Sequence, residues 1–265
     1  HDALPICIDQ ALDQAQYDLM LYTTHRRKAK ESAYVNALTR GLADGLLLVL
    51  PTHASTYLDS LIRQGFPYML VDHQGSGDYR RSVGATNFQG AYDATRYLIE
   101  IGHRRIGHIV GTAALGCAQE RVAGYKAALA DAGLPVDPEL IIQGDFFQPS
   151  GFAGADRLLS LPDRPTAIFA ANDDMAFGVL EAARLRGLSI PTDLSVIGFD
   201  DVPQASIIHP PLTTVRQPLE QMGRVATEHL LKLIEDPELD AERIVLPTEL
   251  IIRQSTCPPA AAPPC

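Results

Sequence analysis

The strongest constraint on the fold is a regular alternation of short apolar runs and longer amphipathic stretches, which continues through most of the 265 residues. Apolar runs without polar alternation are typical of parallel strands buried on both faces. Several of the amphipathic stretches end in a glycine, where a left-handed C-cap is needed. These glycines are Gly41, Gly65, Gly102, Gly133 and Gly187. The sequence therefore predicts a doubly wound α/β fold.

The alternation assigns most of the chain to individual elements. Strands are predicted at 18–24, 45–50, 67–72, 105–111, 140–146, 166–172, 194–201 and 212–217. Stretches such as KESAYVNALTRG (30–41) and DMAFGVLEAARLRG (174–187) have helical periodicity, and a late helix is predicted at 218–236. The segment RIVLPTELIIRQST (243–256) is interpreted as one bent strand, in which Pro247 marks a change of sheet.

One stretch, DHQGSGDYRRSVGATNFQG (72–90), breaks this rhythm with glycines and charged residues. It is a candidate crossover between two α/β halves. Several crossings between two sheets would make a hinged molecule with two lobes. The end of the chain, CPPAAAPPC (257–265), is rich in Pro and Ala and is predicted to be extended or disordered.

Charge and composition limit the classes of partner. A net charge of −10 without a basic stripe is a poor match to a phosphate backbone, so the chain alone is not expected to bind nucleic acid strongly. No window approaches the roughly 18 apolar residues of a membrane span, and the start, HDALPICIDQ, shows no secretory signal. The four cysteines form no CxxC pair and are interpreted as reduced thiols of a cytosolic protein, against a disulfide or zinc site.

Polar and aromatic side chains follow several of the predicted strands. In open parallel sheets, ligands bind outside the carboxyl ends of the strands. Carboxylates and amides bond hydroxyl groups, a guanidinium donates in a planar fork, and an aromatic ring covers an apolar ring face, so such a site suits a sugar. The candidates are Asp72, Phe146, Asn172, Asp173, Asp200 and Asp201, with Arg121 at the start of a helix.

Each candidate also has a structural interpretation. Asn172 or Asp173 could cap the helix that follows, without excluding a ligand contact. Adjacent strand residues point to opposite faces, so only one of Asp200 and Asp201 is expected in a cleft. We assign Asp200 to the cleft and Asp201 to a structural role, either bonded to a backbone amide before Pro203 or facing solvent. Arg121 would ordinarily be a solvated surface residue, Asp72 could simply end its strand, and either Phe146 or Phe147 could be the exposed ring.

Enzymatic functions find little support. The chain has no GxGxxG opening a first βα unit, no GxxxxGK[ST] and no GxSxG, which argues against dinucleotide, P-loop and nucleophile-elbow chemistry. The histidines lack metal-ligand spacing, and His103 and His108 are expected in capping or surface positions. We therefore predict a protein that is not an enzyme, with no catalytic residues, no metal and no cofactor.

Three motifs occur in an order that is specific to one family: RPTAIFAAND (164–173), SVIGFDD (195–201) and PPLTTVRQP (210–218). With the stretches around them they resemble the effector-binding core of the lactose/purine-repressor family of bacterial transcription regulators. The resemblance covers roughly residues 17 to 257. It implies a two-lobed, periplasmic-binding-protein-like fold (type I), in which each lobe is a parallel sheet flanked by helices, three crossovers join the lobes, and the effector binds between them.

The resemblance also implies site residues and lobe boundaries. Effector contacts would come from Asp72, Arg121, Asn172 and Asp200, with Phe146 as the stacking ring and Gln217 at a crossover near the cleft. The N-terminal lobe would comprise 1–86 and 218–246, the C-terminal lobe 87–217 and 247–257, followed by the tail 258–265.

The chain departs from the family pattern at several points. His73 stands where an arginine commonly follows the aspartate, and Thr86 replaces a common aspartate. The family's first strand and its cleft loop are not recognisable, and the chain begins with what should be the first helix. The DNA-binding helix-turn-helix domain is absent from this chain.

Taken together, these features predict the ligand-sensing core of a dimeric, cytoplasmic transcription regulator, most simply a repressor, in which lobe closure alters operator affinity. A sugar is the favoured effector, and a nucleoside or a purine stays open. Operator DNA would be contacted only through the missing domain, and no membrane is involved. Candidate dimer surfaces are the exposed faces of 55–72 and 178–187. The alternative is a transport-linked sugar-binding protein of the same fold.

Overall fold

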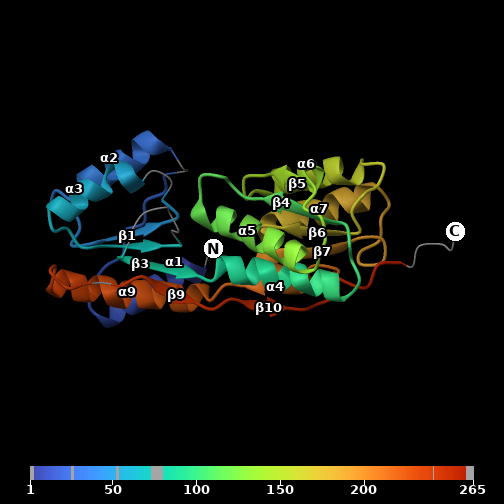
Figure 1. Ribbon diagram of the computed structural model, residues 1–265. Helices are drawn as coiled ribbons and strands as arrows, with labels where there is room; N and C mark the ends of the chain where they lie inside the picture. Colours follow the sequence, from blue (N-terminus) through green and yellow to red (C-terminus); the bar gives the residue numbers. More distant parts are fainter. Residues whose placement is uncertain (1–2, 25–26, 52–53, 73–79, 241, 261–265) are drawn as a thin grey trace. The chain divides into compact units, whose positions relative to one another are not determined.

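The computed structural model describes residues 3–24, 27–51, 54–72, 80–240 and 242–260, and it divides into two compact units (Figure 1). Unit 1 is His1–Ala85 with Pro218–Leu246, and unit 2 is Thr86–Gln217 with Pro247–Cys265. The chain therefore passes between the units three times, after Ala85, Gln217 and Leu246. The sequence had suggested boundaries at residues 86, 217 and 246.

Unit 1 is built on a four-stranded sheet in the order β1-β2-β3-β9, with all pairings parallel. The strands are β1 (Leu46–Val49), β2 (Tyr68–Val71), β3 (Ser82–Ala85) and β9 (Ile244–Leu246). The helices of this unit are α1 (Ala3–Gln14), α2 (Lys28–Leu38), the short 3-10 helix η1 (Ala54–Thr56), α3 (Leu58–Arg63) and α9 (Leu219–Glu235).

Helices cover both faces of this sheet (Figure 1). On one face α1 and α9 pack together, and Ile8 of α1 joins Met222 of α9 and Val71 of β2 in one apolar core. On the other face α2 and α3 bury Val35 and Leu61 against Leu70. Strands buried on both faces need no polar alternation, which explains the continuous apolar runs in the sequence.

Unit 2 contains a six-stranded sheet in the order β10-β8-β7-β6-β4-β5. Its strands are β4 (Ile106–Val110), β5 (Ile141–Gln143), β6 (Ala167–Ala170), β7 (Ser195–Asp200), β8 (Thr213–Arg216) and β10 (Glu249–Ile251). All neighbours are parallel except β10, which pairs antiparallel with β8. An antiparallel edge strand on a parallel sheet is common in α/β folds.

Two helix pairs sandwich this sheet (Figure 1). The pair α4 (Asn87–Glu100) and α5 (Gly116–Asp131) buries Leu98 and Tyr125 on one face. The pair α6 (Gln148–Leu159) and α7 (Asp173–Leu185) buries Leu158 and Val179 on the other. Two short helices complete the unit, η2 (Pro138–Leu140) and α8 (Pro203–Ile207).

Several local predictions are confirmed. All five glycines expected at helix ends have a positive φ, between 60° at Gly65 and 112° at Gly102. Pro247 separates β9, which lies in the four-stranded sheet, from β10, which lies in the six-stranded sheet. The chain begins with a helix, α1, as the resemblance implied.

One local prediction is wrong. Residues 18–24, expected as a strand, form none, and Met20 and Leu21 are 52% and 68% exposed. A strand requires a neighbour that accepts its backbone hydrogen bonds, and this segment pairs with none of the described strands. The predicted crossover 72–90 contains the point at which the chain leaves unit 1, after Ala85, and it also contains a strand, because Ser82–Ala85 form β3 between β2 and β9.

Candidate functional site

A buried arginine organises the polar groups at the carboxyl edge of the sheet in unit 2. Arg121, in the second turn of α5, is 2% exposed. Its Nε donates to Asn87 Oδ1 at 2.8 Å, and its Nη1 donates to the carbonyl oxygen of Ala171. The guanidinium carbon lies 3.6 Å from the ring centroid of Phe199, within the range of a cation–π contact. The arginine is therefore held at once by α4, by the residue that follows β6, and by β7.

Asp200, the last residue of β7, supplies the negative charge of this cluster. Its Oδ1 lies 3.5 Å from Arg121 Nη1 and accepts a hydrogen bond from Gln217 Nε2 at 2.7 Å. Burial raises the pKa of the Asp200 carboxyl, and Arg121 and Gln217 partly offset that effect. The other end of the amide, Gln217 Oε1, is buried without a hydrogen-bond partner among the described residues.

Asn172 and Phe146 form the adjoining side of the cluster. Asn172 is the N-cap of α7, because its Oδ1 accepts from the backbone N–H of Met175 at 3.0 Å. Its Nδ2 donates to the carbonyl oxygen of Phe146 at 3.0 Å, so the same side chain fixes both segments. The Phe146 ring occupies the space that a Cβ on Gly111 would need, and its centroid lies 5.8 Å from the Arg121 guanidinium carbon.

Three of the predicted site residues have left-handed backbones. The φ angles are 54° at Asp72, 73° at Phe146 and 113° at Asp200. Non-glycine residues in this region cost of order 1–3 kcal/mol each and persist only when their surroundings determine them. Such strain concentrates at ligand sites, which supports a functional role for these three positions.

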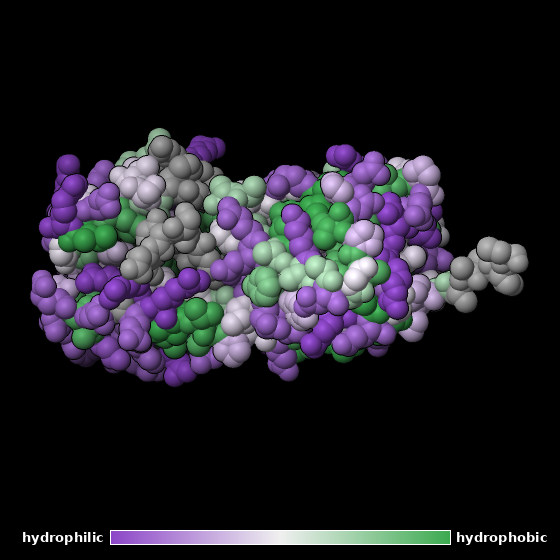
Figure 2. Space-filling view, viewed as in Figure 1, coloured by the Kyte–Doolittle hydropathy of each residue, from purple (hydrophilic) through white to green (hydrophobic). Residues whose placement is uncertain are grey.

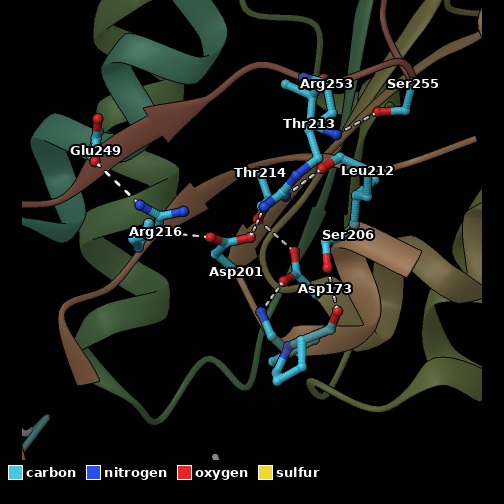
Figure 3. Close-up of polar contacts among 12 residues, drawn as sticks. Asp173, Asp201, Ser206, Leu212, Thr213, Thr214, Arg216, Glu249, Arg253 and Ser255 are labelled. Atoms are coloured by element: carbon cyan, nitrogen blue, oxygen red, sulfur yellow. Dashed lines mark hydrogen bonds and ion pairs between the residues drawn. The ribbon is translucent and has the colours of Figure 1, made fainter. Parts of the chain in front are cut away.

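The structure separates the two adjacent aspartates. Asp201 pairs with Arg216 Nε at 2.8 Å and with Arg253 Nη2 at 2.7 Å (Figure 3). The backbone amide after it, Val202 N, donates instead to Asp173. The sequence suggested that Asp201 bonds a backbone amide before Pro203 or faces solvent. In the structure it does neither, because its side chain contacts two arginines.

The remaining predicted residue, Asp72, lies in unit 1 at the end of β2, where it is 6% exposed. Its backbone N–H donates to the carbonyl oxygen of Val83 at 2.8 Å, which ties the end of β2 to β3. His73, singled out as a departure from the family pattern, lies outside the described residues.

Three surface expectations are wrong. Arg121 is buried in α5 and does not open that helix as a solvated residue, because the helix already begins at Gly116. His103 is 1% exposed and bonds Thr166 and Ser195. His108 is fully buried, with its ring stacked between those of Tyr125 and Phe169, so neither histidine caps a strand at the surface.

Sequence reasoning missed residues that act through these contacts. Asn87 receives the Arg121 Nε hydrogen bond, and Phe199 supplies the ring under the guanidinium. Both lie next to noticed features, since Asn87 follows Thr86 and Phe199 precedes Asp200, but nothing local shows that they meet Arg121. The sequence left open whether Phe146 or Phe147 is the exposed ring. In the structure Phe147 is 54% exposed.

Other features of the described chain lie apart from this cluster. Figure 2 shows apolar residues gathered beside α5 and β5, where a groove of about 410 Å³ is lined by Val110, Val122 and Ile141 among others; none of the predicted site residues lines it.

Across the described ranges, no group of three or more His, Cys, Asp or Glu side chains could hold a metal ion. Cys7, Cys117 and Cys257 are free thiols, and Cys265 lies outside the described residues. No helix of the described part is long and apolar enough to cross a membrane.

Comparisons with known proteins agree with this architecture. A family described as periplasmic binding protein-like domain matches residues 95–256. The HTH-type transcriptional repressor PurR of Photorhabdus laumondii is 37% identical over 241 residues, which is 90% of this chain and 71% of that protein. PurR of Yersinia pestis (strain Pestoides F) is 38% identical over 245 residues, with the same shares of 90% and 71%.

Solved structures give the same result. The transcriptional regulator CelR in complex with cellobiose has a TM-score of 0.89 and 33% identity, covering 96% of this chain and 78% of that one. Transcription regulator CcpA of Lactococcus lactis has a TM-score of 0.87 and 28% identity, covering 96% and 93%.

The fold and the family match define a periplasmic-binding-protein-like domain of two α/β units. The chain belongs to the lactose/purine-repressor family of transcriptional regulators, and it corresponds to the effector-binding domain of these proteins. The relatives named above are transcriptional repressors and regulators, not enzymes.

Proposed function

We propose that this chain is the sensing domain of a DNA-binding transcriptional repressor and that a small polar effector, most simply a sugar, binds at the Arg121 cluster. The observation that carries the proposal is the buried group of Arg121, Asp200 and Gln217, in which Gln217 Oε1 has no hydrogen-bond partner among the described residues. A buried acceptor left unbonded costs about 1–3 kcal/mol, which an effector hydroxyl or N–H would recover.

The charges of the cluster favour an uncharged effector. Asp200 already balances Arg121, whose Nε and Nη1 are directed at protein acceptors. Gln217 Oε1, a buried acceptor without a partner among the described residues, is the atom that we propose a ligand donor bonds. A hydroxyl group of a sugar satisfies it, whereas a phosphate oxygen would not. Asn172 and Phe146 are the proposed amide and ring contacts, and Asp72 of unit 1 is a further proposed contact.

The relatives support two classes of effector. The structure of CelR was solved with cellobiose, and the repressors similar in sequence are named PurR. A sugar is favoured by the buried acceptor and the neutral charge balance, and a nucleoside or purine is the alternative, since its ring N–H groups are also donors. Binding would favour one of two conformations of the core and so alter operator affinity in the intact protein. A coupling of about 1–3 kcal/mol is typical of such allostery.

A thermal-shift screen tests the proposal. The panel comprises cellobiose, glucose, ribose, ribose 5-phosphate, adenosine, guanine and hypoxanthine. A true effector at 100 times its dissociation constant adds about 2.7 kcal/mol to the free energy of unfolding. The test variant is Gln217→Leu, and the matched control is Gln89→Leu, which removes an exposed glutamine of α4 in the same unit.

The expected result is a shift with an uncharged compound in the unmodified protein and in Gln89→Leu. In Gln217→Leu the affinity for that compound should fall about 10-fold. A compound that stabilises all three proteins equally would place the effector elsewhere. Stabilisation by ribose 5-phosphate but by no uncharged compound would overturn the charge argument.

We also propose that the intact protein is a homodimer and that α7 contributes to the interface. A groove of about 380 Å³ beside this helix is lined by Phe177, Leu180, Leu188 and Ile208 among others. Adjacent in sequence to lining residues, Leu185 and Ile207 are 61% and 80% exposed. Apolar groups this exposed on a helix are typical of a protein interface, and a second copy of the chain would cover them.

Location and partners follow from the proposed role. A repressor acts on operator DNA, so we propose a cytoplasmic protein that contacts DNA through a helix-turn-helix domain not contained in this chain. We propose no catalytic activity, metal or cofactor for this chain. The names of the relatives favour this regulator over the transport-linked binding protein.

A further inference from the structure

A second carboxyl group lies beside the proposed effector site without being one of its proposed contacts. Asp173 is the first residue of α7 and is 0% exposed. Its Oδ2 accepts from the backbone N–H of Val202 at 2.9 Å, and its Oδ1 accepts from Thr214 Oγ1 (Figure 3). One carboxyl group thus joins the start of α7, the turn after β7 and the middle of β8.

The backbone of β7 leaves room for this carboxyl. Gly198 faces it, and a Cβ at that position would overlap Asp173 Oδ1. Gly198 of β7 is also the register partner of Thr214 of β8. Thr214 is the residue whose hydroxyl donates to Asp173. The site for the carboxyl is therefore built by the sheet itself.

The turn that Asp173 bonds is the one that carries the effector-site carboxylate. Asp200 and Asp201 both have left-handed backbones, with φ of 113° and 56°. Two successive non-glycine residues in this region cost a few kcal/mol, on the order of 1–3 kcal/mol each, unless outside contacts hold them. Those contacts are Arg216 and Arg253 on the Asp201 side chain, and Asp173 on the next backbone amide, Val202.

Burial and neighbouring charges act on the pKa of Asp173. Burial first, and then the Asp200 carboxylate, raise the pKa of Asp173 well above its usual range. The other charged groups nearby are Asp201, itself paired with Arg216 and Arg253, Asp174 on α7, and Arg121 paired with Asp200. The hydrogen bonds that the carboxyl accepts from Thr214 and from the backbone of Val202 partly offset this rise in the pKa of Asp173.

We propose that Asp173 is a positioning residue of the effector site: its carboxyl group holds the Asp200–Asp201 turn and so places the Asp200 carboxylate beside Arg121 and Gln217. The consequence for the effector rests on the function proposed above, whereas the positioning of Asp200 does not require a ligand.

Three variants separate these effects. Asp173→Ala removes both hydrogen bonds. Asp173→Asn keeps the shape and can still accept from Val202 while its amide donates to Thr214. Asp174→Asn is the matched control, because it neutralises the neighbouring, exposed carboxylate in the same first turn of α7. Two ligand-free measurements are made, the amide hydrogen exchange of Val202 and the ¹³Cγ resonance of Asp200, followed by calorimetry with cellobiose.

In Asp173→Ala we expect Val202 exchange about 10-fold faster, a displaced Asp200 resonance and about 10-fold weaker cellobiose binding. Asp173→Asn should stay close to the unmodified protein in all three measurements, and Asp174→Asn should leave Val202 exchange unchanged, because its carboxyl does not bond that amide. An unchanged Asp200 resonance in Asp173→Ala overturns the proposal. So does a displaced resonance with unaltered cellobiose affinity, because Asp173 would then be structural only.

Two further outcomes are decisive as well. If the unmodified protein does not bind cellobiose, that ligand is excluded, and the Asp200 resonance alone decides whether Asp173 positions the turn. If Asp173→Ala does not fold, Thr214→Val takes its place, since it removes one of the two donors at constant shape. The Asp200 resonance should then move in the same direction by a smaller amount, and a resonance that does not move overturns the proposal.

Discussion

At the scale of single residues, the main correction concerns the Arg121–Asp200 pair. The sequence suggested a solvated surface position for Arg121 and a cleft position for Asp200. In the structure the side chains are 2% and 5% exposed, and Arg121 also satisfies Asn87 and the carbonyl of Ala171. Removing one partner of a buried ion pair leaves an uncompensated charge, which costs more than the lost attraction. The pair therefore stabilises unit 2 in addition to its proposed role in binding.

We predict that Arg121→Ala lowers the free energy of unfolding by roughly 3–5 kcal/mol, because it removes the buried cation beside Asp200 and the hydrogen bonds to Asn87 and to the carbonyl of Ala171. Arg96→Ala is the control: Arg96 lies 3.4 Å from Glu100 on α4, with both side chains more than half exposed. Exposed pairs of this kind contribute at most about 1 kcal/mol. Urea denaturation followed by circular dichroism measures both, and losses of equal size would contradict the prediction.

A second residue-scale prediction concerns His108. Burial lowers its pKa to about 4, from an ordinary value of 6.5, and its Nδ1 bonds the carbonyl of Phe169 at 2.9 Å. As the pH falls from 6.5 towards 4, the unfolded chain takes up a proton that the folded protein does not, so stability decreases over that window. The loss from this group reaches about 3 kcal/mol.

The measurement is the free energy of unfolding against pH for the unmodified protein and for His108→Phe. The variant should lose this part of the acid dependence, since a phenyl ring can still stack between Tyr125 and Phe169. The lowered pKa of His103 acts in the same direction, and the raised pKa values of Asp173 and Asp200 act in the opposite one, equally in both proteins. Parallel pH profiles would show that His108 contributes nothing.

At the scale of elements, the close contact between α6 and α7 depends on Gly151, which faces the backbone of α7. A Cβ on Gly151 would overlap the backbone of Met175 in α7, which cannot move without shifting the helix. For a Cβ on Gly154, about one turn further along α6, the nearest atoms belong to the side chain of Ile109, at 3.1 Å. A side chain can adjust by a few tenths of an ångström, whereas a helix backbone cannot.

We therefore predict that Gly151→Ala destabilises unit 2 by about 1–3 kcal/mol, as overpacking does. In Gly154→Ala the strain should be offset by the higher helix propensity of alanine, which is worth about 1 kcal/mol. Thermal unfolding of the two single variants makes the comparison on one helix. A Gly151→Ala variant as stable as Gly154→Ala would show that α6 and α7 can separate at little cost.

The same scale shows how far elements could be predicted. Helices and buried parallel strands were found where the local pattern was strong, as in β7, α7 and α9. The segment 18–24 has a strand pattern but no described neighbour, and β3 has a weak pattern but two neighbours, β2 and β9. Pairing therefore decided both cases, because a strand is stabilised by its partners as much as by its own residues.

At the scale of the whole molecule, an exposed apolar surface on α7 bears on assembly. Sedimentation velocity should show a dimer for the unmodified chain and a larger share of monomer for Leu180→Glu, which places a charge in the groove lined by Phe177 and Ile208. The control is Ile252→Glu, at a position that is 56% exposed and outside that groove. Equal dissociation by both variants, or none by Leu180→Glu, would locate the interface elsewhere.

The sequence by itself determined the α/β class, the left-handed helix ends, the change of sheet at Pro247 and the family, because each depends on local propensity or on motifs along the chain. Only the tertiary structure decided that Arg121 is buried and that Asp200 contacts Gln217, whereas Asp201 contacts Arg216 and Arg253. It also decided that Asp173 bonds the backbone of Val202, directly after these two aspartates. These contacts join strands and helices that are distant in sequence. The local sequence pattern does not show which side chains the folded sheet brings together.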